Sequence, residues 1–443
     1  MKPTINTPVP GPNAAKIVER DTAALMTSTK TSPIAAKSAR GVWVEDVDGN
    51  TFLDLTAGIG VVNVGHSHPK VVAAVKDQAD KMFHFAGTDF YYDVQVSFAE
   101  RLAAALPGNF DRKVFFTNSG TESNEAAIKI AKHATGRQQF IGFIGAFHGR
   151  TIGSMGFTAS KPTQKKGFFP WMPGVTHVPF PNPYRNVWGI DGYEDPAELT
   201  TKALDYIEGA FQTMLAPEDV AAIWFEPVQG EGGYVVPPMD FYPKLARLAA
   251  DHGILMAADE VQTGFGRTGK MFGQEHYGLE SDIVMMAKGI ANGMPMGAVA
   301  ARAELDFTRM GAHSNTYGGN LMACASGIAT LDVLQTEGLV DNAATVGAYF
   351  KRRLTELADK HDCIGDVRGL GLMLASDFVK DRRSKEPAPK IANGVVSEGM
   401  KRGLVLLPCG KSAVRYIPPL CITQEEVEVA IAILDEAIAV ASA

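Results

Sequence analysis

Short, continuously apolar runs alternate with segments of helical periodicity between about residues 94 and 300. The apolar runs predict strands at residues 113–116, 139–143, 221–225, 253–258 and 282–287. Helical spacing of the apolar positions predicts helices at residues 96–105 and 122–134. Strands that are apolar along their whole length are typical of a sheet buried on both faces. The pattern therefore predicts an α/β domain with a mainly parallel sheet.

The two ends of the chain have different patterns. The polar first part predicts one helix at residues 14–24, and the alternation over residues 42–58 predicts a β-hairpin that turns at Asp48-Gly49. A helix that begins at Pro69 follows, through residue 81.

Helices are predicted at residues 323–336, 342–360 and 392–402 and from Gln424 onward, with strand-like runs between them in the tail. The change in composition near residues 320–340 predicts a domain boundary. The expected division is an N-terminal segment at 1–68 that contributes to a small domain, a large α/β domain at 69–335, and a small α+β domain at 336–443.

Composition narrows the class of protein. The 443 residues carry a net charge of −7, and the nearest approach to a basic patch is Lys161, Lys165 and Lys166, which we interpret as a solvated loop. Neither a nucleic acid nor a membrane surface is therefore an expected partner. No apolar run reaches membrane length and the first residues lack the apolar core of a signal peptide, so a soluble, cytoplasmic protein is expected.

Cysteine and histidine spacing does not indicate a metal site. The four cysteines, Cys324, Cys363, Cys409 and Cys421, lie far apart and form no CxxC motif, which is typical of free thiols in a reducing compartment. His66 and His68 would supply two ligands, but no third lies nearby in the sequence, so no metal site is predicted.

Two of the apolar runs end in opposite charges. The first ends in Asp259 and Glu260, and the second ends in Lys288, directly before a glycine. Lysine is seldom buried without a partner or a role, and burial lowers the pKa of its ammonium group. A lysine with a lowered pKa readily forms imines, so this pair of strand ends is a candidate catalytic centre.

The stretch KVFFTNSGTESNEAAIKIAKHA reads as a strand, a turn of small residues and a helix. The backbone N–H groups of Ser119, Gly120 and Thr121 would point outward at the helix N-terminus and could bind a phosphate. An ordinary capped helix is the alternative. The run Gly264–Gly269 matches GxGxxG, but no strand, turn and helix follow one another directly there, so we interpret the match as spurious.

A lysine for a Schiff base, an acid for a pyridine nitrogen and a phosphate anchor are together the requirements of pyridoxal 5′-phosphate (PLP). Lys288, Asp259 and the helix start at Gly120 supply the three residue types on one predicted sheet. The sequence therefore indicates a PLP enzyme.

Eight sequence blocks extend this interpretation: AGIGVVNVGHSHP, NSGTES, GAFHGRT, EPVQGEGG, ADEVQTGFGRTG, MAKGIANGMPMGA, HSNTYGGN and GDVRGLGLM. With them the chain resembles the class III (ω-amino acid) aminotransferases, which include 4-aminobutyrate and ornithine aminotransferases, from about Gly41 to the C-terminus. The resemblance implies fold type I, with a mainly parallel seven-stranded sheet in the large domain and a smaller α+β domain.

The resemblance also implies roles at the cofactor. Lys288 would form the imine with PLP and then carry the proton between the substrate and the cofactor, while Asp259 would hold the proton on the pyridine nitrogen. The further cofactor contacts that it implies are Ser119, Gly120, Thr121, Phe147, His148, Val261 and Gln262. Val261 and Phe147 would lie on opposite faces of the ring, and Gln262 would contact the phenolic oxygen. Thr316 would reach the phosphate of a neighbouring subunit, which implies a homodimer with shared sites, or a dimer of such dimers.

Substrate recognition is implied at four positions, Ile59, Arg150, Glu226 and Arg415. Arg150 would bind the far carboxylate of the substrate and Arg415 its α-carboxylate, because a guanidinium binds a carboxylate through two parallel hydrogen bonds. Glu226, in EPVQGEGG, would pair with Arg415 when an ω-amine is bound. The alternatives are a solvated arginine at position 150 and a structural ion pair at position 415.

The predicted function is a transaminase that moves an amino group from an ω-amino or α-amino acid, of the 4-aminobutyrate or ornithine type, to 2-oxoglutarate by a ping-pong mechanism. A subgroup with similar PFPNPYRNVWGIDGYE and CGKSAVRYIPPL blocks includes amino-acid racemases, so a PLP racemase or epimerase is the alternative. Racemisation needs a base opposite Lys288. A non-catalytic binding protein is a third hypothesis, against which the intact Lys288 and Asp259 argue.

Overall fold

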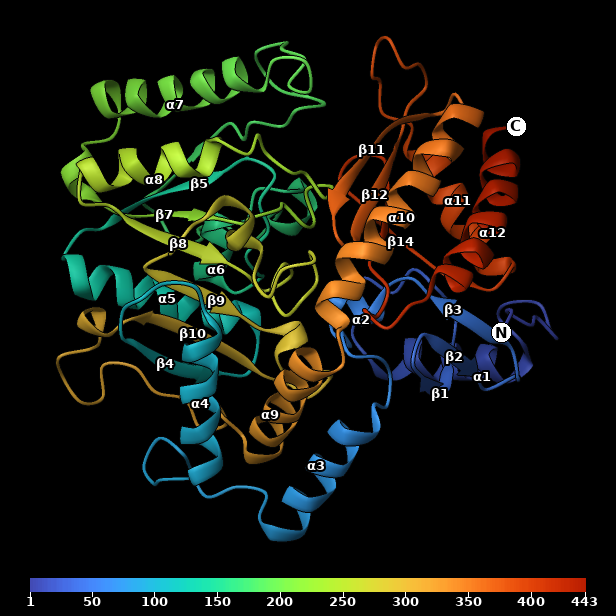
Figure 1. Ribbon diagram of the computed structural model, residues 1–443, viewed down its shortest axis with the longest axis horizontal. Coiled ribbons are helices and arrows are strands. Elements are labelled where there is room, and N and C mark those ends of the chain that lie inside the picture. Colours follow the sequence, from blue (N-terminus) through green and yellow to red (C-terminus); the bar gives the residue numbers. More distant parts are fainter.

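A seven-stranded sheet forms the centre of the larger part of the molecule, in a computed structural model that describes residues 1–443 (Figure 1). The strand order is β4 (Arg112–Thr117), β10 (Gly297–Arg302), β9 (Ile283–Met286), β8 (Leu255–Asp259), β7 (Val220–Phe225), β5 (Gln139–Phe143) and β6 (Val175–Val178). β10 runs antiparallel to both of its neighbours, and the pairs from β9 to β6 are all parallel. The predicted seven-stranded, mainly parallel sheet is confirmed.

All five strands predicted from apolar runs are present, with ends that differ by no more than two residues. The pattern of apolar runs did not predict β10 and β6. β10 consists of small residues directly after a glycine-rich turn, and β6 is a partly exposed edge strand of four residues. Neither has the bulky, continuous apolar run that marks a buried strand.

Helices cover both faces of this sheet. The helices of the chain are α1 (Pro12–Ala24), α2 (Ala57–Gly60), α3 (Pro69–Lys81), α4 (Asp93–Ala105), α5 (Gly120–Thr135), α6 (Ile152–Phe157), α7 (Pro196–Thr213), α8 (Phe241–Asp251), α9 (Leu321–Thr336), α10 (Leu339–Lys360), α11 (Pro389–Lys401) and α12 (Gln424–Ser442). α5 crosses one face, where it contacts five of the seven strands. On the other face, Ile207 of α7 and Leu245 of α8 share a buried cluster with Phe225 of β7. The sequence analysis had not identified α7 and α8.

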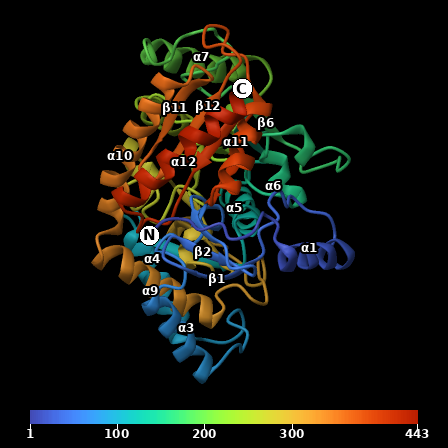
Figure 2. The same ribbon diagram turned by 90° about the vertical axis from the view of Figure 1, so that its right-hand side faces the viewer.

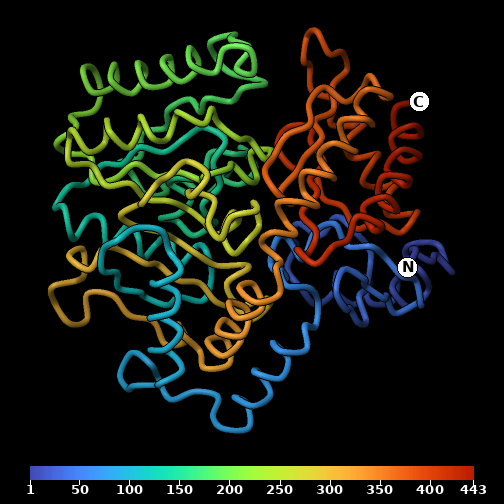
Figure 3. The backbone as a smooth tube through the Cα atoms, viewed as in Figure 1, coloured from blue at the N-terminus to red at the C-terminus, as the bar shows by residue number.

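The smaller part of the molecule is built from both ends of the chain. One four-stranded sheet has the order β1 (Ala36–Arg40), β2 (Trp43–Asp46), β3 (Thr51–Asp54) and β13 (Leu404–Val405). The predicted hairpin is confirmed, because β2 and β3 pair antiparallel. β13 pairs with β3, so the N-terminal and C-terminal segments lie side by side (Figure 3). The domain limits at residues 68 and 335 stay a prediction.

The second small sheet has the order β11 (Ile364–Leu370), β12 (Met373–Phe378), β15 (Ala413–Tyr416) and β14 (Leu407–Cys409). α11 and α12 pack against each other beside it (Figure 2). α12 begins at a capping box in which Thr423 and Glu426 each accept a hydrogen bond from the other's backbone N–H group.

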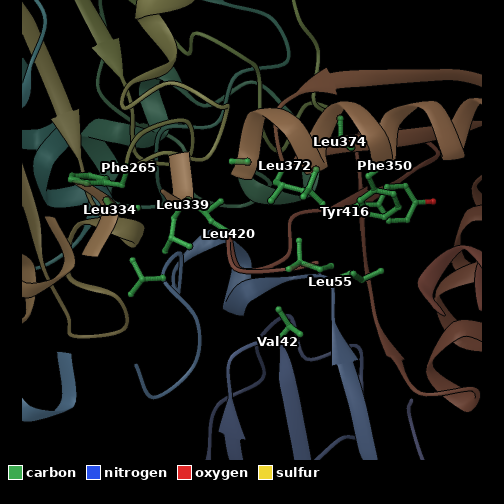
Figure 4. Close-up of a cluster of buried hydrophobic side chains, with 14 of the residues drawn as sticks. Val42, Leu55, Phe265, Leu334, Leu339, Phe350, Leu372, Leu374, Tyr416 and Leu420 are labelled. Atoms are coloured by element: carbon green, nitrogen blue, oxygen red, sulfur yellow. The ribbon is translucent and has the colours of Figure 1, made fainter. Parts of the chain in front are cut away.

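One continuous hydrophobic core joins the two parts. Val42 and Leu55 from the N-terminal segment, Phe265 and Leu334 from the large part, and Tyr416 from β15 belong to the same buried cluster (Figure 4). Burial of about 25 cal/mol per Å² of apolar surface makes such a shared core a strong constraint on how the parts sit together.

The Gly264–Gly269 run is part of this junction. Within it, Arg267 is fully buried and donates hydrogen bonds to the carbonyl of Leu372, at 3.1 Å, and to Oδ1 of Asn63, at 2.7 Å. Burial lowers the pKa of this guanidinium to about 10. The glycines thus allow a loop to fold around a buried arginine, and no α-helix follows directly.

No helix is both long and apolar enough to cross a membrane. No group of three or more His, Cys, Asp or Glu side chains is arranged to hold a metal ion. His66 lies 2.8 Å from a carboxylate oxygen of Asp54, and His68 lies 3.3 Å from Glu337. All four cysteines are free thiols.

Candidate active site

The carboxyl ends of two adjacent parallel strands bring the predicted acid and amine together. β8 ends at Asp259, which lies opposite Met285 of β9, and Lys288 follows two residues after the end of β9. In open parallel sheets this edge is where ligands bind. A cavity of about 440 Å³ opens there.

Twenty residues line the cavity: Val61, Asn118, Ser119, Gly120, Thr121, Asn124, Phe147, His148, Gly149, Arg150, Glu226, Asp259, Val261, Gln262, Ala287, Lys288, Gly293, Met294, Pro295 and Met296. They come from the ends of several strands and from the first turn of α5. The cavity collects eleven of the fourteen residues that the sequence analysis named. The remaining three are Ile59, Thr316 and Arg415.

Lys288 is held in an unfavourable environment for a charged amine. Burial is the main cause that lowers the pKa of its ammonium group, and the nearby Arg415 lowers it further, while Asp259 and Glu226 oppose the shift. Its backbone lies in the left-handed region, with φ of 48°, which for a residue other than glycine costs about 1–3 kcal/mol. A lowered pKa is typical of a lysine that reacts as a neutral amine, and backbone strain of this kind clusters at active sites.

Asp259 is 4% exposed and accepts three hydrogen bonds. Its Oδ2 accepts from Nδ1 of His148, at 2.7 Å, and from the side-chain amide of Asn124, at 3.0 Å. Its Oδ1 accepts from the backbone N–H of Val261, at 3.0 Å. These three hydrogen bonds fix the orientation of the carboxylate at the edge of the cavity, where it would accept from a protonated pyridine nitrogen. The neighbouring Glu260 takes no part, because its oxygens accept from the backbone N–H groups of Gly273 and Gln274.

The start of α5 has the geometry expected of the predicted anion cradle. The Ser119 hydroxyl caps the helix by accepting from the backbone of Glu122, which leaves the first-turn N–H groups of Gly120 and Thr121 without acceptors inside the helix. A Cβ atom at Gly120 would lie 2.9 Å from a methyl group of Val261, so only glycine fits there. Backbone donors at a helix N-terminus suit a phosphate group.

Glu226 lines the cavity but does not form the predicted pair with Arg415. Its two carboxylate oxygens accept instead from the backbone N–H groups of Phe147, at 2.9 Å, and Gly230, at 2.8 Å. Burial raises the pKa of this carboxyl group to about 7. Glu226 follows directly after β7, and this position turns its side chain toward the loop at residue 147.

Glu231, five residues further along the same block, is the partner of Arg415. Its Oε2 lies 3.2 Å from Nη1 of Arg415, and its Oε1 accepts from Lys161 at 2.8 Å. Lys161, interpreted as part of a solvated loop, thus has an ion-pair partner, and in this structure Glu231 and not Glu226 is the partner of Arg415. The block EPVQGEGG contains two glutamates, and only the path of the turn decides which one reaches the arginine.

Arg150 lies at the mouth of the cavity, exposed, with its guanidinium carbon 5.8 Å from the centre of the Phe147 ring. Its position leaves the guanidinium accessible to a substrate carboxylate. Gln262 lines the same cavity, and its side-chain oxygen is buried without a hydrogen-bond partner.

Besides Arg415, two predicted residues lie outside the cavity of this chain. Ile59 is 45% exposed, and Val61, two residues further on, contributes to the lining instead. Thr316 is exposed in the loop between β10 and α9. The sequence analysis missed Asn118, Asn124, Met294 and Met296 among the lining residues. The sequence does contain an indication of Asn124, because it is a polar residue on the buried stripe of a helix.

These residues fit PLP. The helix start at Gly120 would hold its phosphate, Asp259 its pyridine nitrogen and Lys288 its aldehyde carbon, and the buried, unpartnered oxygen of Gln262 offers a further polar atom in the cavity lining. The fold and this set of side chains define a PLP-dependent enzyme of fold type I.

Comparison with known proteins gives the family. A family profile described as Aminotransferase class-III matches residues 25–438. A probable 4-aminobutyrate aminotransferase of Bacillus subtilis is 37% identical over 405 residues, 90% of this chain and 92% of that protein. An alanine/serine racemase of Pyrococcus horikoshii is 38% identical over 441 residues, 98% of this chain and 92% of that protein.

The fold agrees with solved structures. The structure of an amine transaminase from an uncultivated Pseudomonas species, in a PLP-bound form, matches with a TM-score of 0.87 at 31% identity and covers 94% of this chain and 97% of that one. The chain belongs to the class III aminotransferase family. It is accordingly a PLP-dependent enzyme.

Proposed function

We propose that the enzyme transfers an amino group from an ω-amino acid of the 4-aminobutyrate or ornithine type to 2-oxoglutarate, by a ping-pong mechanism. The observation that carries this proposal is the pair of arginines beside Lys288. Arg150 is free to bind a carboxylate, whereas Arg415 is neutralised by Glu231. A site with one free and one neutralised arginine suits both a substrate with one carboxylate and a substrate with two.

The side chains divide the work as follows. PLP, when bound, supplies a carbonyl carbon that condenses with amines and a ring that withdraws electrons. Lys288, with its lowered pKa, carries the proton between the substrate carbon and the cofactor. Asp259 holds the proton at the ring nitrogen. Arg150 aligns the far carboxylate of the substrate, so that the amine approaches the cofactor in one orientation.

The Glu231–Arg415 pair accounts for two classes of substrate at one site. The reacting carbon of an ω-amino donor has a hydrogen atom where that of an α-amino acid has a carboxylate. Arg415 therefore keeps Glu231 as its partner. 2-Oxoglutarate places its α-carboxylate there, and Glu231 then turns away from Arg415 while Lys161 retains it. The ion pair to Lys161 at 2.8 Å supports this scheme, because it gives the released glutamate a second cation.

Glu231→Gln should therefore affect the two half-reactions unequally. Without the carboxylate, Arg415 remains an unpaired cation when an ω-amino donor binds, so kcat/KM for 4-aminobutyrate should fall by roughly tenfold to a hundredfold, the range for one hydrogen bond to a charged group. The KM for 2-oxoglutarate should fall or stay unchanged. Steady-state kinetics with each substrate varied separately measures both values. Equal losses in the two half-reactions would contradict the scheme.

Arg150→Ala should weaken dicarboxylic acceptors more than monocarboxylic ones. Loss of two charge-assisted hydrogen bonds should raise the KM for 2-oxoglutarate by on the order of tenfold to a hundredfold and leave the KM for pyruvate nearly unchanged. Arg383→Ala, at an exposed arginine of the loop after β12, is the matched control and should change neither value. Parallel losses for both acceptors would remove the role of Arg150.

A racemase is the second candidate, because one of the compared relatives is an alanine/serine racemase. Racemisation requires a free base opposite Lys288. The nearby carboxylates are engaged here, Glu226 by two backbone N–H groups and Glu231 by Arg415 and Lys161, which favours amino transfer.

A screen of amino donors against 2-oxoglutarate and pyruvate, run beside a racemisation assay without any keto acid, distinguishes the two candidates. The proposal expects amino transfer that depends on a keto acid. Inversion of an amino acid in the absence of keto acid, with no transfer when one is supplied, would establish the racemase instead.

We also propose a homodimer whose subunits share their active sites. A run of exposed aromatic side chains, Phe83, Phe85, Phe90 and Tyr91, lies in the segment between α3 and α4 and supports an interface there, since large exposed apolar patches mark contact surfaces. The exposed Thr316 would complete the phosphate site of the other subunit. Light scattering measures the mass of the protein in solution, and a mass equal to that of one chain would contradict the homodimer. The cytoplasmic location stays a prediction.

A further inference from the structure

The side-chain amide of Asn124 joins three parts of the active site. Its Nδ2 donates to Oδ2 of Asp259, at 3.0 Å, and to the backbone carbonyl of Gly120, at 2.9 Å. Its Oδ1 accepts from Nε1 of Trp224, at 2.7 Å. Asn124 is 1% exposed and Trp224 is fully buried. Both N–H groups of this amide thus have an acceptor, and one of the two lone pairs of its oxygen has a donor.

Trp224 fixes which way the amide points. An indole N–H can only donate, so the atom of Asn124 that faces it must be the oxygen. The amide nitrogen must then face Asp259 and Gly120, which can only accept through the atoms they present. The hydrogen-bonding chemistry of these neighbours therefore decides which end of the amide is oxygen and which is nitrogen.

The three residues sit on rigid elements. Asn124 lies one turn into α5, directly below the anion cradle, and Trp224 is the next-to-last residue of β7. Trp224 also packs against Phe157 and Phe140, with ring centres 4.6 Å and 5.9 Å apart. The aromatic cluster therefore holds the indole, the indole holds the amide, and the amide holds the carboxylate of Asp259.

We propose that Asn124, oriented by Trp224, is a positioning residue that keeps the carboxylate of Asp259 directed at the pyridine nitrogen, and that couples this carboxylate to the phosphate cradle. The inference rests on the proposed role of Asp259. Loss of the amide donor leaves His148 as the one remaining partner of Oδ2 of Asp259, so the carboxylate is aligned less firmly with the ring nitrogen. The proton on the ring nitrogen is then held less well, which weakens the ring as an electron acceptor.

Asn124→Leu removes the donor and keeps the number and branching of the side-chain heavy atoms, and Trp224→Phe removes the indole N–H that orients the amide, together with part of the ring system. Holoenzyme loaded with PLP labelled with ¹⁵N at the ring reports the proton directly through its NMR shift. In Asn124→Leu the signal should move toward the unprotonated position, and kcat should fall by roughly tenfold to a hundredfold, the range for one hydrogen bond to a charged group, with little change in KM. Trp224→Phe should shift both values in the same direction by less.

Trp43→Phe is the matched control, because Trp43 donates its indole N–H to a carboxylate oxygen of Glu426, at 2.8 Å, far from the cavity. It should lower the melting temperature without moving the ¹⁵N signal. If both test variants behave as this control does, with unchanged ¹⁵N shift and kcat, Asn124 is a packing residue and the proposal is overturned. Failure of the proposed function would appear differently, as turnover retained by Lys288→Ala.

Discussion

Replacement of Lys288 by alanine is expected to abolish amino transfer. The change removes both the amine that binds the cofactor covalently and the group that carries the proton, and proton transfer by a positioned side chain alone contributes about 10²–10⁴-fold. The visible absorbance of the lysine-bound cofactor should be lost as well. Absorbance spectra and steady-state assays of purified enzyme, with 4-aminobutyrate and 2-oxoglutarate as substrates, measure both effects.

Lys244→Ala is the matched control for this variant. Lys244 is an exposed lysine of α8 that pairs with Asp240 one helical turn away, at 2.7 Å. Its loss should leave the spectrum and the turnover unchanged. Turnover by Lys288→Ala close to that of the wild type would rule out the proposed chemistry at this site.

Asp259→Asn is expected to have the second largest effect. An amide cannot stabilise a proton on the ring nitrogen as a carboxylate does, so electron withdrawal by the ring should weaken. A loss in kcat on the order of 10²–10³, the range for removal of one preorganised electrostatic group, should accompany weaker retention of PLP. Stopped-flow absorbance for the donor half-reaction and equilibrium dialysis for the cofactor measure the two effects.

Glu260→Gln tests whether the loss of a neighbouring buried carboxylate lowers kcat as the loss of Asp259 does. Glu260 is adjacent and fully buried, and burial raises its pKa to about 7, but its oxygens accept from the loop backbone at Gly273 and Gln274. Its substitution should reduce thermal stability and leave the spectrum of the bound cofactor intact. A kinetic loss that equals that of Asp259→Asn would show that burial, and not contact with the ring, explains the effect.

The sequence predicted the centre of the site because strand ends can be read from it. Asp259 and Lys288 each close an apolar run, and in a parallel sheet such ends meet at one edge. The helix start at Gly120 was visible for a similar reason, since small residues between a strand and a helix mark a turn that exposes backbone N–H groups. These features are local, and the structure brings them together without changing them.

Contacts that depend on the path of a turn could not be predicted. Glu226 and Glu231 stand in one block, and the sequence offers no reason to prefer either as the partner of Arg415. The reversal of the chain at Gly230 decides it, because Glu226 is held by backbone N–H groups while Glu231 extends to Arg415 and Lys161. The periodicity of apolar residues does not tell which side chains of different elements pair with each other.

Asn124 is an intermediate case. Positions 120, 124, 127 and 131 of α5 form one stripe at helical spacing, and the residues from 123 to 131 on its inner side are almost all buried. A polar residue in that stripe needs a buried hydrogen-bond partner. The sequence could therefore have indicated that Asn124 has a partner, although not that the partner is Asp259.

A single half-reaction, measured without an acceptor, is the most direct test of amino transfer at this site. Purified holoenzyme mixed with 4-aminobutyrate alone should release one equivalent of the carbonyl product per active site and then stop. Addition of 2-oxoglutarate should restore the original absorbance and yield one equivalent of glutamate. Continued turnover without an acceptor, or no product until both substrates are present together, would contradict the ping-pong transfer proposed here.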